Sequence, residues 1–291
     1  MSDQDNFHFG YKQNSPGIEL LTLILCLFLG MSLGGLIGYG IMAAGSGTIE
    51  TTKLLLVVQQ LTLFIIPAIL FTYILFRRDS VNELGLSSFA SLRIFLLSLM
   101  SIFTVSIFIQ YSYQLNQMLP MPEWMLEMEE ESESLIKQIL VMDNIQDLIL
   151  NILLIGVLPA IGEELLFRGV IQKRLAHHLK NPQMAIWISS IIFSAIHFQF
   201  QGFFPRMFLG ALLGYLFWLG GSLWLAILVH FINNAFQVLM YYLYEKKITN
   251  IDLDAEFAIP WSGALVSLGI TLTLIYLIKK WGKNASDSTQ I

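Results

Sequence analysis

Three short motifs place carboxylate, imidazole and amide side chains inside otherwise apolar stretches of this 291-residue chain. The motifs are Glu163-Glu164-x-x-x-Arg168, Phe193-x-x-x-His197 and His230-x-x-x-Asn234. Ionisable residues are rare and costly in segments long enough to cross a membrane, so each of them is a hypothesis for function. Together they predict chemistry with water inside a lipid bilayer.

The two adjacent glutamates are predicted to differ in role. Neighbouring residues of a helix point about 100° apart, so Glu163 and Glu164 cannot share one direction. Glu164 and Arg168 lie four residues apart with the acid first, which favours an ion pair. Glu163 has no such partner nearby in the sequence, and a desolvated, unpaired carboxylate suits a general base that activates water. The alternative is a charge cluster at the membrane surface without a catalytic role.

The two histidine motifs supply further polar groups. Phe193 precedes His197 by one helical turn, so its ring is expected to pack against the imidazole, and a purely structural His197 is the alternative. His230 and Asn234 are four residues apart and therefore share one face of a helix. Both can donate hydrogen bonds to a developing oxyanion, and a histidine can also bind a metal. Asn233 is expected to point elsewhere.

The elements that carry these motifs are predicted to be membrane-spanning helices. The chain is 55% hydrophobic and only 13% charged, against about 25% charged residues in soluble domains. We therefore expect an all-α integral membrane protein with about eight transmembrane helices around a polar cavity. The apolar segments, each about the length that a span requires, are 18–44, 54–76, 92–115, 145–164, 184–200, 207–220, 223–243 and 261–281.

The fourth segment ends at residue 164, which places Glu163 and Glu164 at its inner end. Basic residues are scattered, so no nucleic-acid surface is expected. The single cysteine, Cys26, excludes an internal disulfide. His177 and His178 have no evident partner, and no role is assigned to them.

The distribution of basic residues predicts that both termini lie in the cytoplasm. With this orientation eleven basic residues fall on the cytoplasmic side: Lys12, Arg77, Arg78, Arg93, Arg168, Lys173, Arg174, Lys180, Lys279, Lys280 and Lys283. The other five fall outside: Lys53, Lys137, Arg206, Lys246 and Lys247. Residues 116–144 form the one longer connection, which is acidic and amphipathic. It is predicted to be a helix on the membrane surface, or alternatively a lid over a substrate entrance.

In combination the three motifs resemble the CAAX-protease and bacteriocin-processing (CPBP or Abi) family of intramembrane endopeptidases, which includes the type II CAAX prenyl proteases. Each motif is weak alone, but three complete motifs in this order are specific. Residues 82–86, Asn-Glu-Leu-Gly-Leu, also look like a stretch common in bacterial members. The chain divides accordingly into a polar tail (1–17), N-terminal helices with the acidic connection (18–144), a catalytic core (145–245) and a last helix with its tail (246–291).

The resemblance implies an eight-helix bundle whose cavity opens to the cytoplasm and the membrane. The short loops and tails indicate the membrane of a bacterial cell. It implies a hydrolase that cleaves peptide bonds of membrane-associated proteins or peptides. Glu163 and His197 would activate water, and His230 with Asn234 would stabilise the oxyanion. Glu164, Arg168 and Phe193 would hold the site in shape.

Two questions stay open at this point. The family is often described as metalloproteases with zinc, and Glu163, His197 and His230 could form a His₂Glu zinc set. The chain lacks the His-Glu-x-x-His spacing of common zinc proteases, and we favour a mechanism without a cofactor. The rival functions are a non-catalytic immunity or scaffold protein and a transporter or proton relay, although the inverted repeats typical of transporters are not visible.

Overall fold

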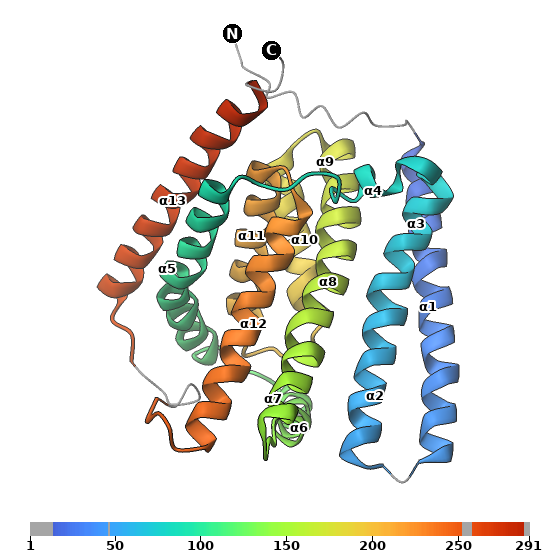
Figure 1. Cartoon of the computed structure of the whole chain (residues 1–291), viewed down its shortest axis with the longest axis vertical. Helices are drawn as coiled ribbons and strands as arrows, with labels where there is room; N and C mark the ends of the chain where they lie inside the picture. The colour runs from blue at the N-terminus through green and yellow to red at the C-terminus, as the bar shows by residue number, and fades with distance from the viewer. Residues whose placement is uncertain (1–13, 46, 252–257, 288–291) are drawn as a thin grey trace.

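The computed structural model describes residues 14–45, 47–251 and 258–287, with the backbone alone for 283–287. All regular structure in these residues is helical, and the long helices stand side by side in one bundle (Figure 1). The predicted all-α membrane architecture is confirmed. Seven helices are long and apolar enough to cross a membrane.

The first three spans are α1 (Pro16–Ala44), a continuous helix from Ile49 to Glu83, and α5 (Leu92–Gln117). The second span consists of α2 (Ile49–Gln60), the π-helical η1 (Leu61–Ile65), α3 (Ile66–Phe76), η2 (Arg77–Asp79) and α4 (Ser80–Glu83). The amphipathic helix α6 (Glu123–Ile139) follows α5. The last three spans are α11 (Phe203–Gly220), α12 (Leu223–Glu245) and α13 (Trp261–Asp287). The segment predicted at 184–200 is α10 (Pro182–Ala195), whose 14 residues make it shorter than the other spans.

The helix that carries the two glutamates runs without interruption from Ile145 to Leu179. It consists of α7 (Ile145–Asn151), η3 (Ile152–Val157), α8 (Leu158–Glu164), η4 (Leu165–Gln172) and α9 (Lys173–Leu179). Its start is fixed by a capping box, in which the side chains of Asn144 and Asp147 bond each other's backbone N–H groups. Its end is fixed by Lys180, which adopts a left-handed conformation.

The predicted end of this span at residue 164 is therefore wrong, and Glu163 and Glu164 lie in its middle. Every residue from Gly162 to Val170 is buried, so the charged residues of this stretch face protein and not water. Arg168, Lys173 and Arg174 are accordingly buried helix residues, and they do not count as cytoplasmic loop charges.

Buried ion pairs fix α9 to the N-terminal helices. Arg174 lies 2.7 Å from the Glu83 carboxylate and 3.4 Å from that of Glu19. Lys173 Nζ donates to the Glu83 carbonyl at 2.5 Å, and His178 Nε2 lies 2.7 Å from Glu19 Oε2. His178 thus has a partner, contrary to expectation. The glutamate of the Asn-Glu-Leu-Gly-Leu stretch serves as an anchor between α4 and α9.

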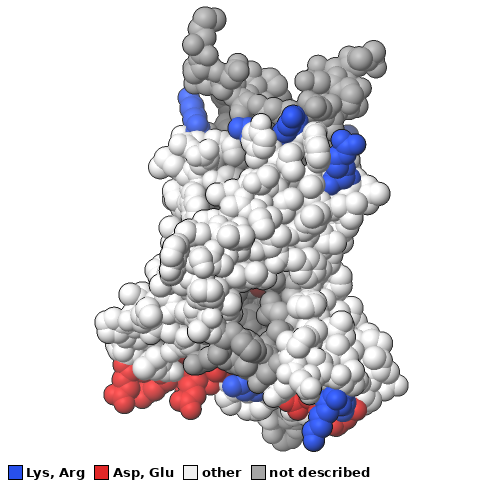
Figure 2. Space-filling model, turned by 90° about the vertical axis from the view of Figure 1, so that its left-hand side faces the viewer, with Lys and Arg blue, Asp and Glu red and all other residues white. Residues whose placement is uncertain are grey.

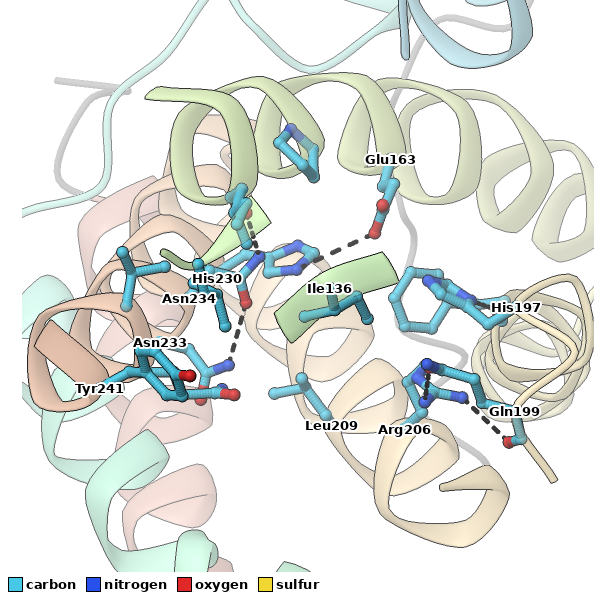
Figure 3. A pocket seen from close by; sticks show the side chains of 16 residues that line it. Ile136, Glu163, His197, Gln199, Arg206, Leu209, His230, Asn233, Asn234 and Tyr241 are labelled. Atoms are coloured by element: carbon cyan, nitrogen blue, oxygen red, sulfur yellow. Dashed lines mark hydrogen bonds and ion pairs between the residues drawn. The ribbon is translucent and has the colours of Figure 1, made fainter. Parts of the chain in front are cut away.

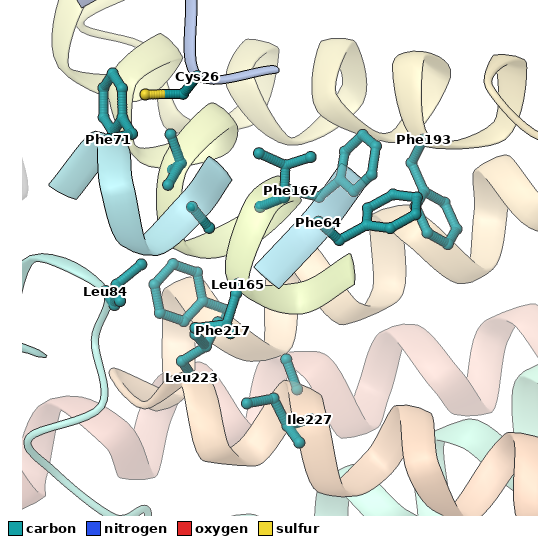
Figure 4. Close-up of a cluster of buried hydrophobic side chains, with 14 of the residues drawn as sticks. Cys26, Phe64, Phe71, Leu84, Leu165, Phe167, Phe193, Phe217, Leu223 and Ile227 are labelled. Carbon is teal, nitrogen blue, oxygen red and sulfur yellow. The ribbon is translucent and has the colours of Figure 1, made fainter. Parts of the chain in front are cut away.

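An aromatic cluster supports the middle of the bundle (Figure 4). The ring of Phe167 contacts Phe64 at 6.4 Å and Phe193 at 5.1 Å between centroids. All three side chains are buried. The cluster therefore joins the second span, η4 and α10 next to the polar motifs.

One end of the bundle shows basic side chains, the other shows acidic side chains together with a few basic ones, and an uncharged band lies between them (Figure 2). Six exposed basic residues lie at the end where α1 begins and α13 ends; they are Arg77, Arg78, Arg93, Lys180, Lys279 and Lys280. Three others lie at the opposite end; they are Lys137, Lys246 and Lys247. Exposed acidic residues of α6 lie at the opposite end; they are Glu123, Glu127, Glu130, Glu131 and Glu133. The uncharged band between these ends is suited to the interior of a membrane.

Candidate active site

The three motifs meet at one cavity of about 460 Å³ (Figure 3). Glu163 of α8 reaches it from one side, and His230 and Asn234 of α12 from another. His197, just after α10, completes the wall. Segments up to about 70 residues apart in sequence thus place a carboxylate, two imidazoles and an amide around one space.

Behind the cavity, Glu164 and Arg168 form the predicted ion pair, with Nη1 and Oε1 2.7 Å apart. Both side chains are buried, at 0% and 1% exposure. Arg168 Nη2 also donates to the Gly210 carbonyl at 3.0 Å, and its guanidinium lies 4.7 Å from the centre of the Phe193 ring. A buried pair of this kind fixes geometry more than it adds stability.

His230 joins the two glutamates. Its Nδ1 lies 2.8 Å from Glu164 Oε1. A carboxylate accepts, so Nδ1 carries the proton of this bond. Its Nε2 faces Glu163, 4.0 Å from Oε2. That separation is too long for a direct hydrogen bond and short enough for one bridging water.

His197 is held by the backbone of its own motif. Its Nδ1 lies 2.7 Å from the Phe193 carbonyl oxygen, which can only accept, so Nδ1 carries the proton and Nε2 keeps a lone pair. The Phe193 ring meets the imidazole edge to face, with centroids 5.0 Å apart. The same ring lies 6.2 Å from that of His230. The aromatic residue of the second motif therefore packs against both histidines.

Asn234 is oriented by two hydrogen bonds. Its Nδ2 donates to the Ile155 carbonyl at 3.2 Å, and its Oδ1 accepts from Asn233 Nδ2 at 3.1 Å. Pro159 has no N–H, so the Ile155 carbonyl lacks its usual α-helical donor. Asn233 itself lines the cavity, and the expectation that it points elsewhere is wrong.

Zinc does not fit the three proposed ligands as they are arranged. Nowhere in 14–45, 47–251 or 258–282 do three His, Cys, Asp or Glu side chains converge as a metal site requires. Glu163 and His230 approach each other, but His197 does not join them in a three-ligand set. A catalytic zinc needs three protein ligands within about 2.0–2.2 Å of the ion.

Helix α6 covers the cavity. Ile136 and Leu140 line it from this side, and Figure 3 shows Ile136 lying across it. Glu129 Oε2 accepts from Gln201 N at 2.9 Å, and Asn151 Nδ2 donates to the Ile139 carbonyl at 2.7 Å. The helix is thus fixed to the bundle within its first half, at Glu129, and at its last residue, Ile139.

The position of α6 bears on orientation. The cavity is lined by Ile136 of α6 and Tyr241 of α12. Figure 1 shows α6 and the end of α12 at the end of the bundle opposite to the start of α1 and the end of α13. If the start of α1 and the end of α13 face the cytoplasm, the cavity lies in the half of the bundle nearer the opposite side of the membrane. Further polar residues of the cavity wall were missed in the sequence; they are Gln199, Arg206, Gln237 and Tyr241.

Comparison with known proteins gives one family match, to the part of the chain that contains the three motifs. The model of the family described as "Type II CAAX prenyl endopeptidase Rce1-like" matches residues 145–236. This range contains all three motifs. No curated protein and no solved structure matches the chain. Residues 145–236 of this membrane protein are therefore similar to the Rce1-like family, and the match does not extend over the rest of the chain.

Proposed function

We propose that the protein is an intramembrane endopeptidase that hydrolyses peptide bonds of membrane-associated proteins or peptides. The observation that carries this proposal is the pair formed by Glu163 and His230. A carboxylate oxygen and an imidazole nitrogen face each other at 4.0 Å inside a cavity of a membrane bundle. One water molecule in the cavity, beside the line that joins these two atoms, can bridge them.

In the proposed reaction Glu163 is the general base. It takes a proton from this water while the water oxygen forms a bond to the carbonyl carbon of the substrate. His197 Nε2 accepts a hydrogen bond from the same water and orients it. The protonated Glu163 then gives its proton to the leaving nitrogen as the carbon–nitrogen bond breaks.

The oxyanion of the tetrahedral intermediate is assigned to His230 and Asn234. Asn234 Nδ2 has two hydrogens and gives only one to the Ile155 carbonyl. His230 can donate from Nε2 when both of its ring nitrogens carry a proton. Glu164 and Arg168 hold the imidazole in the required direction.

The reaction is proposed to run without a metal ion, because the three candidate ligands do not converge. The partners are a membrane-associated polypeptide and the bilayer itself. Since basic residues gather at the end that carries the termini, we place that end in the cytoplasm. The cavity and α6 then face the opposite side of the membrane.

The test compares peptide termini in membranes of cells that express the wild type, Glu163→Gln or the control Glu127→Gln. Glu127 is an exposed carboxylate of α6 that does not line the cavity. New termini should appear with the wild type and the control and disappear with Glu163→Gln. Equal termini in all three strains, at equal protein abundance, would instead favour a non-catalytic immunity or scaffold role.

A further inference from the structure

An arginine outside the three motifs lines the same cavity. Arg206 lies in the first turn of α11 and is half-buried. Figure 3 shows it beside Gln199, on the His197 side of the cavity and across from His230 and Asn234. A guanidinium in a cavity of a membrane bundle calls for an explanation, because a desolvated charge needs a partner.

The hydrogen-bond partners of Arg206 are neutral. Its Nη1 donates to the Gln199 carbonyl at 3.2 Å, and its Nη2 donates to Gln199 Oε1. Among the residues that the structure describes, no carboxylate lies within ion-pair distance of it. Glu129 and Glu163 act on its charge only from farther away. Arg168 and Arg174, in contrast, each contact a carboxylate at 2.7 Å.

The chain makes room for this guanidinium. A Cβ atom at Gly202 would lie 2.6 Å from Arg206 Nη2 and 3.2 Å from Cζ. Any residue with a side chain at 202 would therefore push the guanidinium out of its position. Gly202 leaves the space that the guanidinium of Arg206 occupies, and Gln199 binds the guanidinium there.

A guanidinium offers five N–H donors and binds a carboxylate best, through two parallel hydrogen bonds. Gln199 engages only part of this set. We propose that Arg206 is a specificity residue, which binds a carboxylate of the peptide substrate close to the scissile bond. This inference rests on the proposed function and adds a chemical requirement for the substrate. Either the C-terminal carboxylate of a peptide or an Asp or Glu side chain can meet it.

The test measures binding without turnover, in the purified Glu163→Gln protein. The probes are two pairs of fluorescent apolar heptapeptides. The first pair differs at the C-terminus, which is a free acid or an amide. The second pair consists of C-terminal amides that differ at one internal residue, Glu or Gln. An acidic probe should bind about tenfold or more tightly than its neutral counterpart, as expected for hydrogen bonds to a charged group. The acidic probe that shows this preference identifies the source of the carboxylate.

Variants then assign the preference to Arg206. Added to the Glu163→Gln protein, Arg206→Gln should make acidic and neutral probes bind equally, whereas Arg206→Lys should keep part of the difference. Gly202→Ala should reduce the preference while the guanidinium remains in the chain. The control is Arg93→Gln, because Arg93 is an exposed arginine at the other end, 4.9 Å from the Trp281 ring; it should keep the full preference.

The inference is overturned if the Glu163→Gln protein, with Arg206 intact, binds acidic and neutral probes with equal affinity. It is also overturned if this protein binds none of the probes. So does a preference that persists in Arg206→Gln. Proteolysis itself is judged separately, by the peptide termini that depend on Glu163. A protease without acid preference therefore refutes only the role of Arg206, and acid preference without new termini refutes only the protease.

Discussion

His230 and Glu164 are joined across the bundle by a contact of 2.8 Å between Nδ1 and Oε1. They belong to different motifs, on α12 and α8. The other nitrogen of the same ring faces Glu163 at 4.0 Å. The two neighbouring glutamates therefore have separate tasks: Glu164 holds the imidazole, and Glu163 faces the cavity.

This division predicts opposite phenotypes for two matched substitutions. Glu164→Gln should lower the free energy of unfolding by about 3–5 kcal/mol, because Arg168 would lose its buried carboxylate partner. Glu163→Gln should leave the free energy of unfolding nearly unchanged or raise it, because it removes a desolvated charge whose contact with His230 Nε2 spans 4.0 Å, too long for a direct hydrogen bond. Reversible unfolding of both variants in detergent measures the difference. Equal losses in the two variants would contradict the division.

Asn234 provides a test of the oxyanion assignment. Asn234→Ala should lower kcat about 10²–10³-fold, the usual cost of one oxyanion donor. KM should change little, because the donor acts mainly on the tetrahedral intermediate. Steady-state kinetics on a substrate found from the new termini checks this. Asn233→Ala is the matched comparison and should cost less, since the Asn233 amide donates to Asn234 Oδ1 and is not assigned to the oxyanion.

The sequence predicts the local part of this site well. The four-residue spacing of Glu164 and Arg168 identifies the ion pair that the structure contains. The same four-residue spacing between Phe193 and His197 predicts that the aromatic ring packs on the imidazole, as the structure shows. Both contacts lie within single helical turns, where spacing alone determines which side chains meet.

Contacts between distant segments escape the same reasoning. The bond between His230 and Glu164 depends on how α12 packs on α8, which no spacing within a helix specifies. The end of the fourth span was misplaced because charged residues interrupt its apolar pattern. In the fold those charges are buried and paired: Arg168 with Glu164, and Arg174 with Glu83 and Glu19. Arg206 was missed for a related reason, since it precedes an apolar run and resembles a loop charge.

Close packing at Gly210 predicts a sensitive position. A Cβ atom there would lie 3.1 Å from Phe193 Cδ1 and 3.3 Å from Arg168 Nη2. Gly210→Ala should cost about 1–3 kcal/mol through overpacking and should also lower activity, because both neighbours shape the site. Gly269→Ala on α13 is the control, because its added methyl group meets nothing within 4 Å. The free energies of unfolding of the two variants give the comparison, and equal values would contradict the packing argument.

Activity should survive removal of metal ions. The reason is geometric, since Glu163, His197 and His230 do not converge as zinc ligands. Prolonged treatment with a chelator, followed by an assay in metal-free buffer, should leave at least most of the wild-type rate. Treatment with the chelator should likewise leave the affinity of the Glu163→Gln protein for the peptide probes unchanged. Loss of activity that added zinc restores would show that the three ligands rearrange around an ion.

Chemical labelling of single engineered cysteines can show which side of the membrane the cavity faces. Most of the exposed basic residues lie at the end where α1 begins and α13 ends, and the acidic residues of α6, which lines the cavity, lie at the other end. Because basic residues are retained in the cytoplasm, Ser134→Cys on α6 should react with a membrane-impermeant maleimide in intact cells. Ser87→Cys, in the connection between α4 and α5, should react only after the cells are opened.

The native Cys26 is 3% exposed, so the wild type should give little background. The expected pattern places cleavage outside the cytoplasm, and substrates would then be segments that reach the outer half of the membrane. The reverse pattern would place α6 and the cavity in the cytoplasm together with the substrate. In that case the termini would lie outside, against the distribution of Arg77, Arg78 and Lys180. Labelling of both cysteines in intact cells would contradict the bundle itself, because the two positions lie at its opposite ends.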